Sequence, residues 1–115
     1  MKVEIRRQGV EVGEPVRAHI ERRLRFTLGK FGSRVQRVNV FLSDLNGPKG
    51  GVDKRCRLVV RLRSGVVTVE ERDVELIDLV DRTVDRLGRT VRRNLERRRT
   101  AGFSRNAEPD FAGRV

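Results

Sequence analysis

The sequence contains very few of the residues that build disulfide frameworks, zinc sites or aromatic platforms. Its 115 residues include one Cys, one His and five Phe, with no Trp or Tyr. A single Cys excludes an internal disulfide, and one Cys with one His cannot hold a structural zinc ion. So few aromatic side chains also argue against an aromatic platform on which single-stranded nucleic acid stacks.

Long apolar runs are missing as well. No stretch approaches the roughly 20 apolar residues that span a bilayer, and the N-terminal segment lacks the apolar core of a signal peptide. We therefore expect a soluble, cytoplasmic, reduced protein that inserts into no membrane. The length predicts one domain, residues 1–100, followed by a disordered tail, residues 101–115.

Basic charge is what the chain has in excess. Lys and Arg number 27 against 16 Asp and Glu, which gives a formal net charge of +11. Such a field attracts polyanions, namely nucleic acid, an anionic membrane surface or an acidic protein. Nearly all the basic residues are arginine, whose planar guanidinium binds phosphate through two parallel hydrogen bonds.

Hydrophobic periodicity predicts six elements of secondary structure. The expected strands are 2–8, 35–45, 54–63 and 66–72, and the expected helices run from Pro15 to Gly32 and over 73–99, with a flexible loop at 46–53. The order β-α-β-β-β-α predicts an α+β fold. We expect a four-stranded mixed sheet with two helices packed on one face, as in double-stranded-RNA-binding domains.

Strict alternation in 54–63 predicts which side chains face the core. Cys56 is expected to be buried as a small hydrophobic residue. The outward side chains of this segment are Arg55, Arg57, Arg61 and Arg63, and they either keep an open sheet face soluble or bind a partner. A turn at Ser64-Gly65 predicts that Leu62 pairs with Val67, which places Glu70 diagonal to Arg57 and Arg61.

The second helix is predicted to carry two opposed stripes. Its apolar stripe is Ile77, Val80, Val84, Leu87, Val91 and Leu95. Directly opposite lies a row of arginines, namely Arg82, Arg86, Arg89, Arg93 and Arg97. At about 1.5 Å rise per residue this row is roughly 22 Å long, enough to follow a stretch of phosphate backbone.

Two interpretations of the arginine row remain open. In the first it is a solvated face, supported by the i,i+4 pairs Asp78–Arg82 and Asp85–Arg89. In the second it binds a polyanion, because Arg86 and Arg93 are left without an obvious partner. The second interpretation is favoured, and Arg22 and Arg25 of the first helix would extend the binding surface. The polyanion that fits best is RNA recognised through its backbone.

Catalytic residues are not evident. We expect His19 to be a surface residue and three aspartates to serve turns and caps, namely Asp44, Asp53 and Asp73. Phe26 is either a partly exposed stacking residue or, as we favour, packs at a helix end. No metal-ligand spacing or phosphate-binding loop is present. The sequence predicts a protein that is not an enzyme and that uses no cofactor, metal or small-molecule substrate.

Three segments, 9–24, 44–62 and 78–98, resemble the ribosome hibernation promoting factor and ribosome-associated inhibitor family (sigma-54 modulation protein-like). The similarity covers nearly all of residues 1–100 and is most telling around VDRLGRTVRR. It implies a factor that binds the 30S subunit or 70S ribosome and blocks the messenger RNA channel and the A and P sites of transfer RNA. The residues it implies against 16S ribosomal RNA are Arg22, Arg25, Arg82, Arg86, Arg89, Arg92 and Arg93, to which the helical row adds Arg97.

The chain also departs from the family pattern. Ile77 stands where members often have Tyr, and the chain stops at residue 115, without the C-terminal dimerisation domain of the long form. The resemblance is therefore to the short form, expected to be a monomer off the ribosome and to silence translation in stress or stationary phase. The alternatives are a generic double-stranded RNA-binding module and a transcription regulator that acts through an acidic protein partner.

Overall fold

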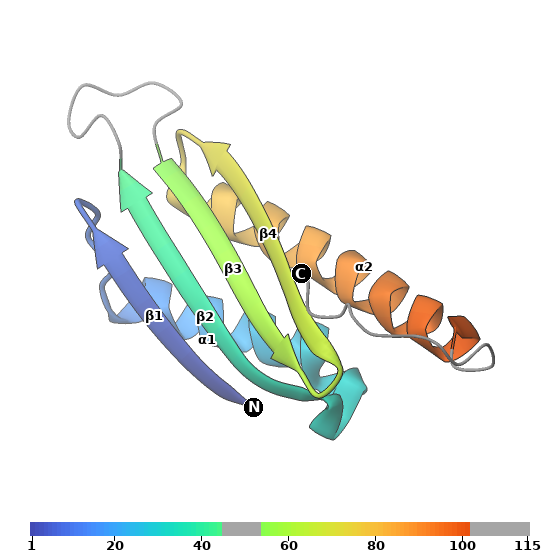
Figure 1. Ribbon diagram of the computed structural model, residues 1–115. Coiled ribbons are helices and arrows are strands. Elements are labelled where there is room, and N and C mark those ends of the chain that lie inside the picture. Colours follow the sequence, from blue (N-terminus) through green and yellow to red (C-terminus); the bar gives the residue numbers. More distant parts are fainter. Residues whose placement is uncertain (45–53, 102–115) are drawn as a thin grey trace.

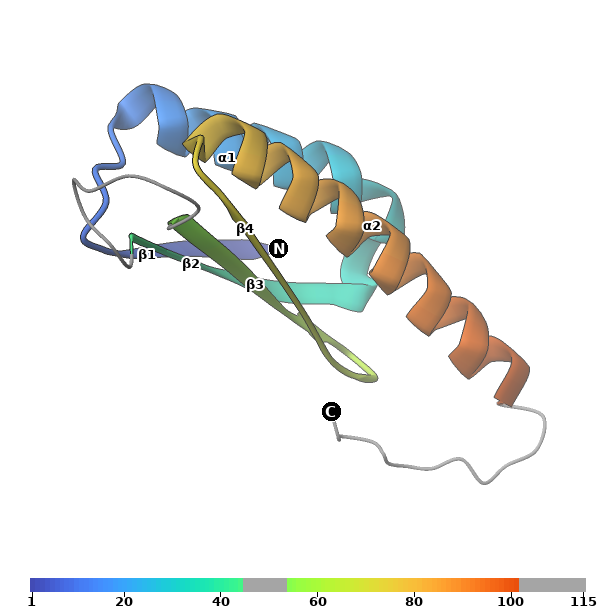
Figure 2. The same cartoon turned by 90° about the horizontal axis from the view of Figure 1, so that it is seen from above.

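The computed structural model describes residues 1–44 and 54–101, with side chains described as far as Arg97. Four strands form one sheet in the order β1 (Lys2–Gln8), β2 (Val35–Asp44), β3 (Lys54–Leu62) and β4 (Gly65–Asp73). Two helices, α1 (Glu14–Leu28) and α2 (Leu76–Ala101), lie on the same face of that sheet (Figures 1 and 2). The predicted α+β fold and element order are confirmed.

The sheet is mixed because α1 carries the chain back to run β2 parallel to β1, whereas the other neighbouring strands are antiparallel. The predicted loop at 46–53 lies outside the described residues, as does the predicted tail beyond Ala101. The boundaries of the strands agree with the predicted ones to within about a residue.

The first helix ends earlier than its apolar spacing predicts. Pro15 fits the first turn, where its missing N–H is not needed, but α1 ends at Leu28. A 3₁₀ segment, η1 (Gly29–Arg34), follows and turns the chain into β2. Phe31, expected on the helix, is instead buried from η1, where it closes the end of the core below α1.

The β3–β4 hairpin is two residues out of the predicted register. Leu62 pairs with Gly65 rather than with Val67, so the loop consists of Arg63 and Ser64. Gly65 has φ +155°, a value that residues with a Cβ rarely adopt, which fixes the turn there. Because side chains alternate with a period of two, a two-residue shift leaves every side chain on its predicted face.

The core fills the space between the inner face of the sheet and the two helices. On α2 the predicted positions Val80, Val84, Leu87 and Val91 are buried, while Ile77 and Leu95 are only half-buried. Leu79 and Thr83 are fully buried and were missed. The buried side of α2 is thus turned toward β4. The buried Thr83 hydroxyl donates a hydrogen bond to the Leu79 carbonyl at 2.6 Å, so its polar group is paired.

Cys56 lies in this core, as predicted. It is almost fully buried on β3, and burial raises the pKa of its thiol to about 12, with a hydrogen bond to Thr83 acting in the opposite direction. A thiol of that pKa stays protonated and unreactive at neutral pH.

The helices cross closely at Gly88. A Cβ built on Gly88 would lie 2.6 Å from Cγ2 of Thr27 on α1, which is shorter than any ordinary carbon–carbon contact. The absence of a side chain at residue 88 therefore lets the middle of α2 rest against the end of α1, and it sets how the outer faces of the two helices adjoin.

Candidate nucleic-acid interface

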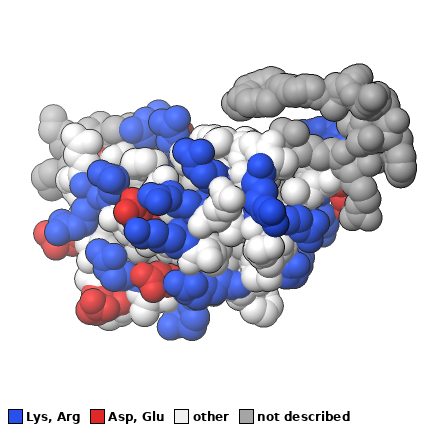
Figure 3. Space-filling view, turned by 60° about the horizontal axis from the view of Figure 1, so that its bottom comes forward, with Lys and Arg blue, Asp and Glu red and all other residues white. Residues whose placement is uncertain are grey.

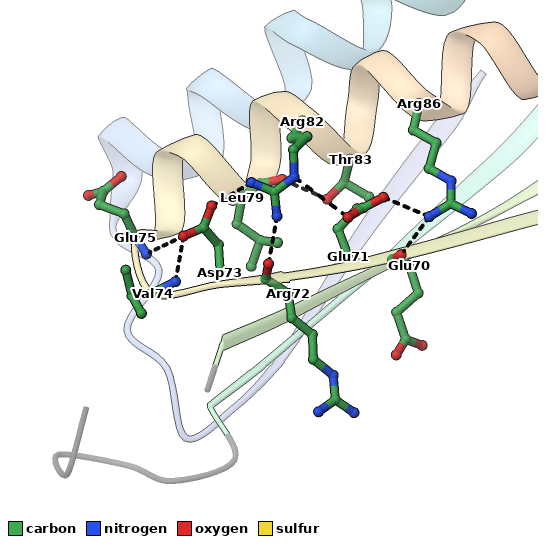
Figure 4. A network of polar contacts seen from close by, with 10 residues as sticks. All are labelled: Glu70, Glu71, Arg72, Asp73, Val74, Glu75, Leu79, Arg82, Thr83 and Arg86. Carbon is green, nitrogen blue, oxygen red and sulfur yellow. Dashed lines mark hydrogen bonds and ion pairs between the residues drawn. The ribbon is translucent and has the colours of Figure 1, made fainter. Parts of the chain in front are cut away.

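Arg82, near the start of α2, is bound by groups at the end of β4. Its guanidinium donates to the Asp73 carboxylate and to the Arg72 carbonyl, both at 2.5 Å, and lies 3.5 Å from Glu71 (Figure 4). The Arg82 hydrogen bond and the backbone N–H of Val74 lower the pKa of Asp73. The predicted Asp78–Arg82 pair is wrong, because the carboxylate of Asp73 takes its place.

Arg86 is also bound to β4. Its Nη1 donates to the Glu71 carboxylate at 2.6 Å and to the Glu70 carbonyl at 3.1 Å (Figure 4). The prediction that Arg86 has no partner in the chain is therefore wrong. The partner is 15 residues away in the sequence and lies on a strand, so the spacing along the helix gives no sign of it.

Two aspartates on the other flank of α2 bind α1. The Asp85 carboxylate accepts from Arg23 at 2.6 Å, and that of Asp81 contacts Arg23 at 3.1 Å and Nε2 of His19 at 2.7 Å. Burial tends to raise the pKa of Asp81, but the hydrogen bonds from His19 and Arg23 lower it overall. Burial also tends to lower the pKa of Arg23, and its two carboxylate partners raise it overall.

These contacts overturn one further prediction and add a partner to another predicted residue. Asp85 pairs with Arg23 of α1 and not with Arg89. His19 keeps 26% of its side chain exposed, in keeping with the predicted surface position, and contacts Asp81 of α2. Both changes have one cause: the side-by-side packing of α1 and α2 brings together charges that are about 60 residues apart.

Six of the eight arginines predicted to bind RNA have no such partner. Within the described part of the chain, no hydrogen bond or ion pair joins their guanidinium groups to a carboxylate, and all six are exposed. We call them the unpaired arginines: Arg22, Arg25, Arg89, Arg92, Arg93 and Arg97. Four of them follow Gly88 on α2, where the helix runs on past the edge of the sheet (Figures 1 and 2).

The two unpaired arginines of α1 lie on different sides of that helix. Arg23 and Thr27 mark the side that touches α2. At 3.6 residues per turn, Arg22 then faces away from the sheet, whereas Arg25 lies on the flank remote from α2. Arg22 thus continues the outer face of α2 more directly than Arg25 does.

Phe26 was expected to pack at the end of a helix, and this prediction is wrong. Its side chain is 84% exposed on α1, because Leu28 and Phe31 close the end of the core in its place. A large apolar side chain therefore stands among the exposed arginines of α1.

Of the three aspartates expected in turns and caps, Asp73 is confirmed, and the turn or cap role of Asp44 stays a prediction. The Asp73 carboxylate accepts from the backbone N–H groups of Val74 and Glu75 just before α2, and Asp44 at the end of β2 pairs with Lys54. Asp53 lies outside the described residues. Among residues 1–44 and 54–101, no three His, Cys, Asp or Glu come together as a metal site, and no helix is long and apolar enough to cross a membrane.

Comparison with known proteins identifies the family. The family model described as sigma 54 modulation protein / S30EA ribosomal protein matches residues 3–99. The chain belongs to this family. The resemblance inferred from the sequence is thereby confirmed.

Solved structures agree with this assignment. The N-terminal domain of Protein Y from Thermus thermophilus is 33% identical, with a TM-score of 0.63, over 80% of this chain and 93% of that one. A ribosomal subunit interface protein from Coxiella burnetii shares the fold, with 14% identity and a TM-score of 0.68, over 83% of this chain and 99% of that one. No significant match was found among curated protein sequences.

Proposed function

We propose that this protein binds the small ribosomal subunit through 16S ribosomal RNA and blocks the positions of messenger RNA and of transfer RNA in the A and P sites. Membership of a family described as ribosomal protein supports a ribosomal partner. The similarity to a Protein Y domain points in the same direction.

The observation that carries the proposal is the set of unpaired arginines. An arginine that no carboxylate neutralises keeps its full charge and hydrogen-bonding capacity for an external anion. Arg89 and Arg93 lie one helical turn apart on the outer face of α2, with Arg92 and Arg97 beside them. Such a row suits the repeated phosphates of a folded RNA, and contacts with phosphates do not depend on the base sequence.

The mechanism is occupancy and needs no chemical step. Arginine–phosphate contacts hold the domain in the channel, and its volume excludes the other ligands. Since each phosphate contact releases counterions, affinity should fall steeply with salt. We further expect the protein to act in the cytoplasm, as a monomer off the ribosome, when translation is silenced under stress or in stationary phase.

The test is competition on the isolated 30S subunit. Labelled protein is added to subunits that are empty or already loaded with messenger RNA and P-site transfer RNA, and bound protein is measured by sedimentation. The proposal predicts binding to empty subunits and strong exclusion from loaded ones. Equal binding to both would refute occupancy of the channel.

A second candidate is a generic double-stranded RNA-binding module. It is favoured by the same unpaired arginines, because contacts between guanidinium groups and phosphates carry no sequence information and would form with any helical RNA backbone. Free duplex RNA distinguishes the two: at equal salt, a ribosome-specific protein stays with 30S subunits in excess duplex, whereas a generic binder is displaced. Binding that survives nuclease treatment would instead indicate the third possibility, an acidic protein partner.

A further inference from the structure

The face of the sheet that the helices leave open carries a second basic surface. Strand pairing aligns Arg6, Phe41 and Arg57 in one row across β1, β2 and β3. The next row toward the ends of β1 and β2 contains Gln8, Ser43, Arg55 and Arg72. Their strand neighbours Ile5, Val40, Leu42 and Leu58 face the core, so these two rows face away from the helices.

Figures 3 and 4 agree with this arrangement. In Figure 4 the side chain of Arg72 points away from α2, on the opposite side of β4 from Arg82. Figure 3, an oblique view from below, shows Lys and Arg side chains at many places on the visible surface, with Asp and Glu side chains between some of them. The chain is therefore basic on both sides, and the unpaired arginines of the helices account for only one of them.

Phe41 lies in a hollow within this second surface. Its side chain is 38% exposed at the middle of the row. The hollow has a volume of about 220 Å³, and its lining includes Phe41 together with Arg6, Arg55 and Arg57 of the same face. Ser43, nearly buried, also lines it, as does Arg7 on the edge strand β1. A single exposed Phe is ordinary on a protein surface. Three arginines of the same face that line one hollow with it, Arg6, Arg55 and Arg57, are a less ordinary arrangement.

The groups in the hollow remain open to a ligand. Arg6 lies 3.7 Å from Glu4, a long and solvated contact, and Glu70 stands opposite Arg57 without forming an ion pair within the described residues. Arg7 and Arg55 likewise have no ion pair there. Among the described residues, the cation–π contacts are those of Lys30 and Arg34 with the ring of Phe31. No such contact involves the ring of Phe41 there.

We propose that this hollow binds one nucleotide of a single-stranded RNA, with its base stacked on Phe41 and its phosphates held by the surrounding arginines. A flat ring amid cations fits a nucleotide, which pairs a flat base with an anion. The strand must be single, because the bases of a duplex stack on one another and are closed to the ring. The inference does not depend on the proposed ribosomal function.

The arrangement lets one small domain contact two RNA segments at once. The unpaired arginines lie on the helical side and grip a backbone, whereas Phe41 lies on the opposite side and takes a base. The scarcity of aromatic residues argues against a platform of several stacked bases, but one ring suffices for one nucleotide.

The test is a titration with a short single-stranded oligouridine. It uses the variant Arg89→Gln/Arg93→Gln, in which the helical surface is weakened so that binding to the sheet dominates. Ring signals of the five Phe are followed by NMR, which is simple because the chain has no Tyr or Trp. The ring of Phe41 should shift with oligouridine and not with duplex RNA at equal phosphate concentration.

Substitution of the ring gives the affinity readout. In the same background, Phe41→Leu should weaken oligouridine binding about 5- to 150-fold, the usual cost of losing one stacked base. The matched control is Phe26→Leu, which removes a more exposed ring outside the hollow and should change binding less than about twofold. Equal losses from the two substitutions, or none from Phe41→Leu, would overturn the proposal.

The arginines and the class of partner are tested separately. Arg6→Gln/Arg57→Gln should lower the slope of log affinity against log salt by about 1.4, that is about 0.7 for each phosphate released. An unchanged slope would show that these arginines do not contact the phosphates and would overturn the proposal. If a short polyglutamate peptide displaces oligouridine with equal strength, the surface recognises acidic protein and not RNA. Unchanged circular dichroism and melting show that each variant is folded.

Discussion

The two halves of α2 place their arginines in different surroundings. Before Gly88, Arg82 and Arg86 are held by carboxylates and carbonyl groups of β4. After Gly88, Arg89 and Arg93 are exposed and, within the described residues, have no carboxylate partner. The first half lies over the sheet, whereas the second packs on the core through Val91 and then runs past the sheet (Figure 2). What an arginine does here depends on the neighbour that the fold brings to it.

The pairs in the first half position the helix more than they stabilise it. Arg82 and Arg86 are about half exposed in these pairs, and ion pairs of that kind contribute little to the free energy of unfolding. Together with Asp81 and Asp85, which bind α1, they fix how α2 is rotated on its neighbours. That rotation presents Arg89 and Arg93 to solvent.

The largest expected effect concerns the core under each half. Leu87 is fully buried and Leu95 only half-buried. Leu87→Ala should lower the free energy of unfolding by about 2–5 kcal/mol, and Leu95→Ala by no more than about 1 kcal/mol. Urea unfolding measures both. Equal losses of unfolding free energy would show that the helix is packed as tightly at Leu95 as at Leu87, and would contradict the difference between the two halves.

A smaller effect is expected at the boundary between the halves. Gly88→Ala should cost about 1 kcal/mol net, since overpacking against Thr27 outweighs the better helix propensity of Ala. Thr27→Ser removes the Cγ2 methyl group that the new Cβ would contact too closely. The double variant Thr27→Ser/Gly88→Ala should therefore recover most of the lost stability. Thermal melting compares the three proteins. If Gly88→Ala is stabilising by itself, the helices do not approach as closely as described.

Acid should weaken the attachment of the first half. The pKa of Asp81 is lowered in the folded state, so its contribution is present above its unfolded value of about 3.9 and is lost as pH falls through the folded value. Asp81→Asn should therefore reduce the fall in unfolding free energy between neutral pH and pH ~3. Asp78→Asn is the control, because within the described residues the Asp78 carboxylate has no partner. An identical acid response of wild type and Asp81→Asn would contradict the role of Asp81.

The smallest effect comes from turning a paired arginine into a free one. Glu71→Gln removes the carboxylate that contacts both Arg82 and Arg86. An exposed pair is worth up to about 1 kcal/mol, so its loss should raise affinity for 30S subunits by at most about fivefold. Sedimentation binding at low salt detects this. A fall in affinity would indicate that the pair itself orients the binding surface.

Local patterns in the sequence were enough for the element order and for the faces of the strands. Alternation in β3 and spacing in α2 put Cys56, Val84 and Leu87 in the core, where they are. The hairpin register was wrong by two residues because both registers place apolar side chains on one face. In the structure Gly65 takes φ +155° at the turn, a feature that the apolar pattern does not reveal.

Partners from other elements could not be predicted in this way. The helical spacing assigned Asp85 to Arg89 and left Arg86 unpaired, whereas the fold supplies Arg23 to the first and Glu71 to the second. The hollow around Phe41 is a similar case, because its arginines come from β1 and β3 and meet only through strand pairing. Such contacts depend on register and helix rotation.

The central claim is that the arginines after Gly88 bind RNA and those before it do not. Two matched variants test it, Arg89→Gln/Arg93→Gln and Arg82→Gln/Arg86→Gln, each of which removes two positive charges. Their affinities for 30S subunits are measured by sedimentation over a range of salt. We predict that Arg89→Gln/Arg93→Gln lowers the affinity about 100-fold or more and lowers the slope of log affinity against log salt by about 1.8. Arg82→Gln/Arg86→Gln should change the affinity and the slope only slightly. Equal losses, or a greater loss from Arg82→Gln/Arg86→Gln, would contradict the account.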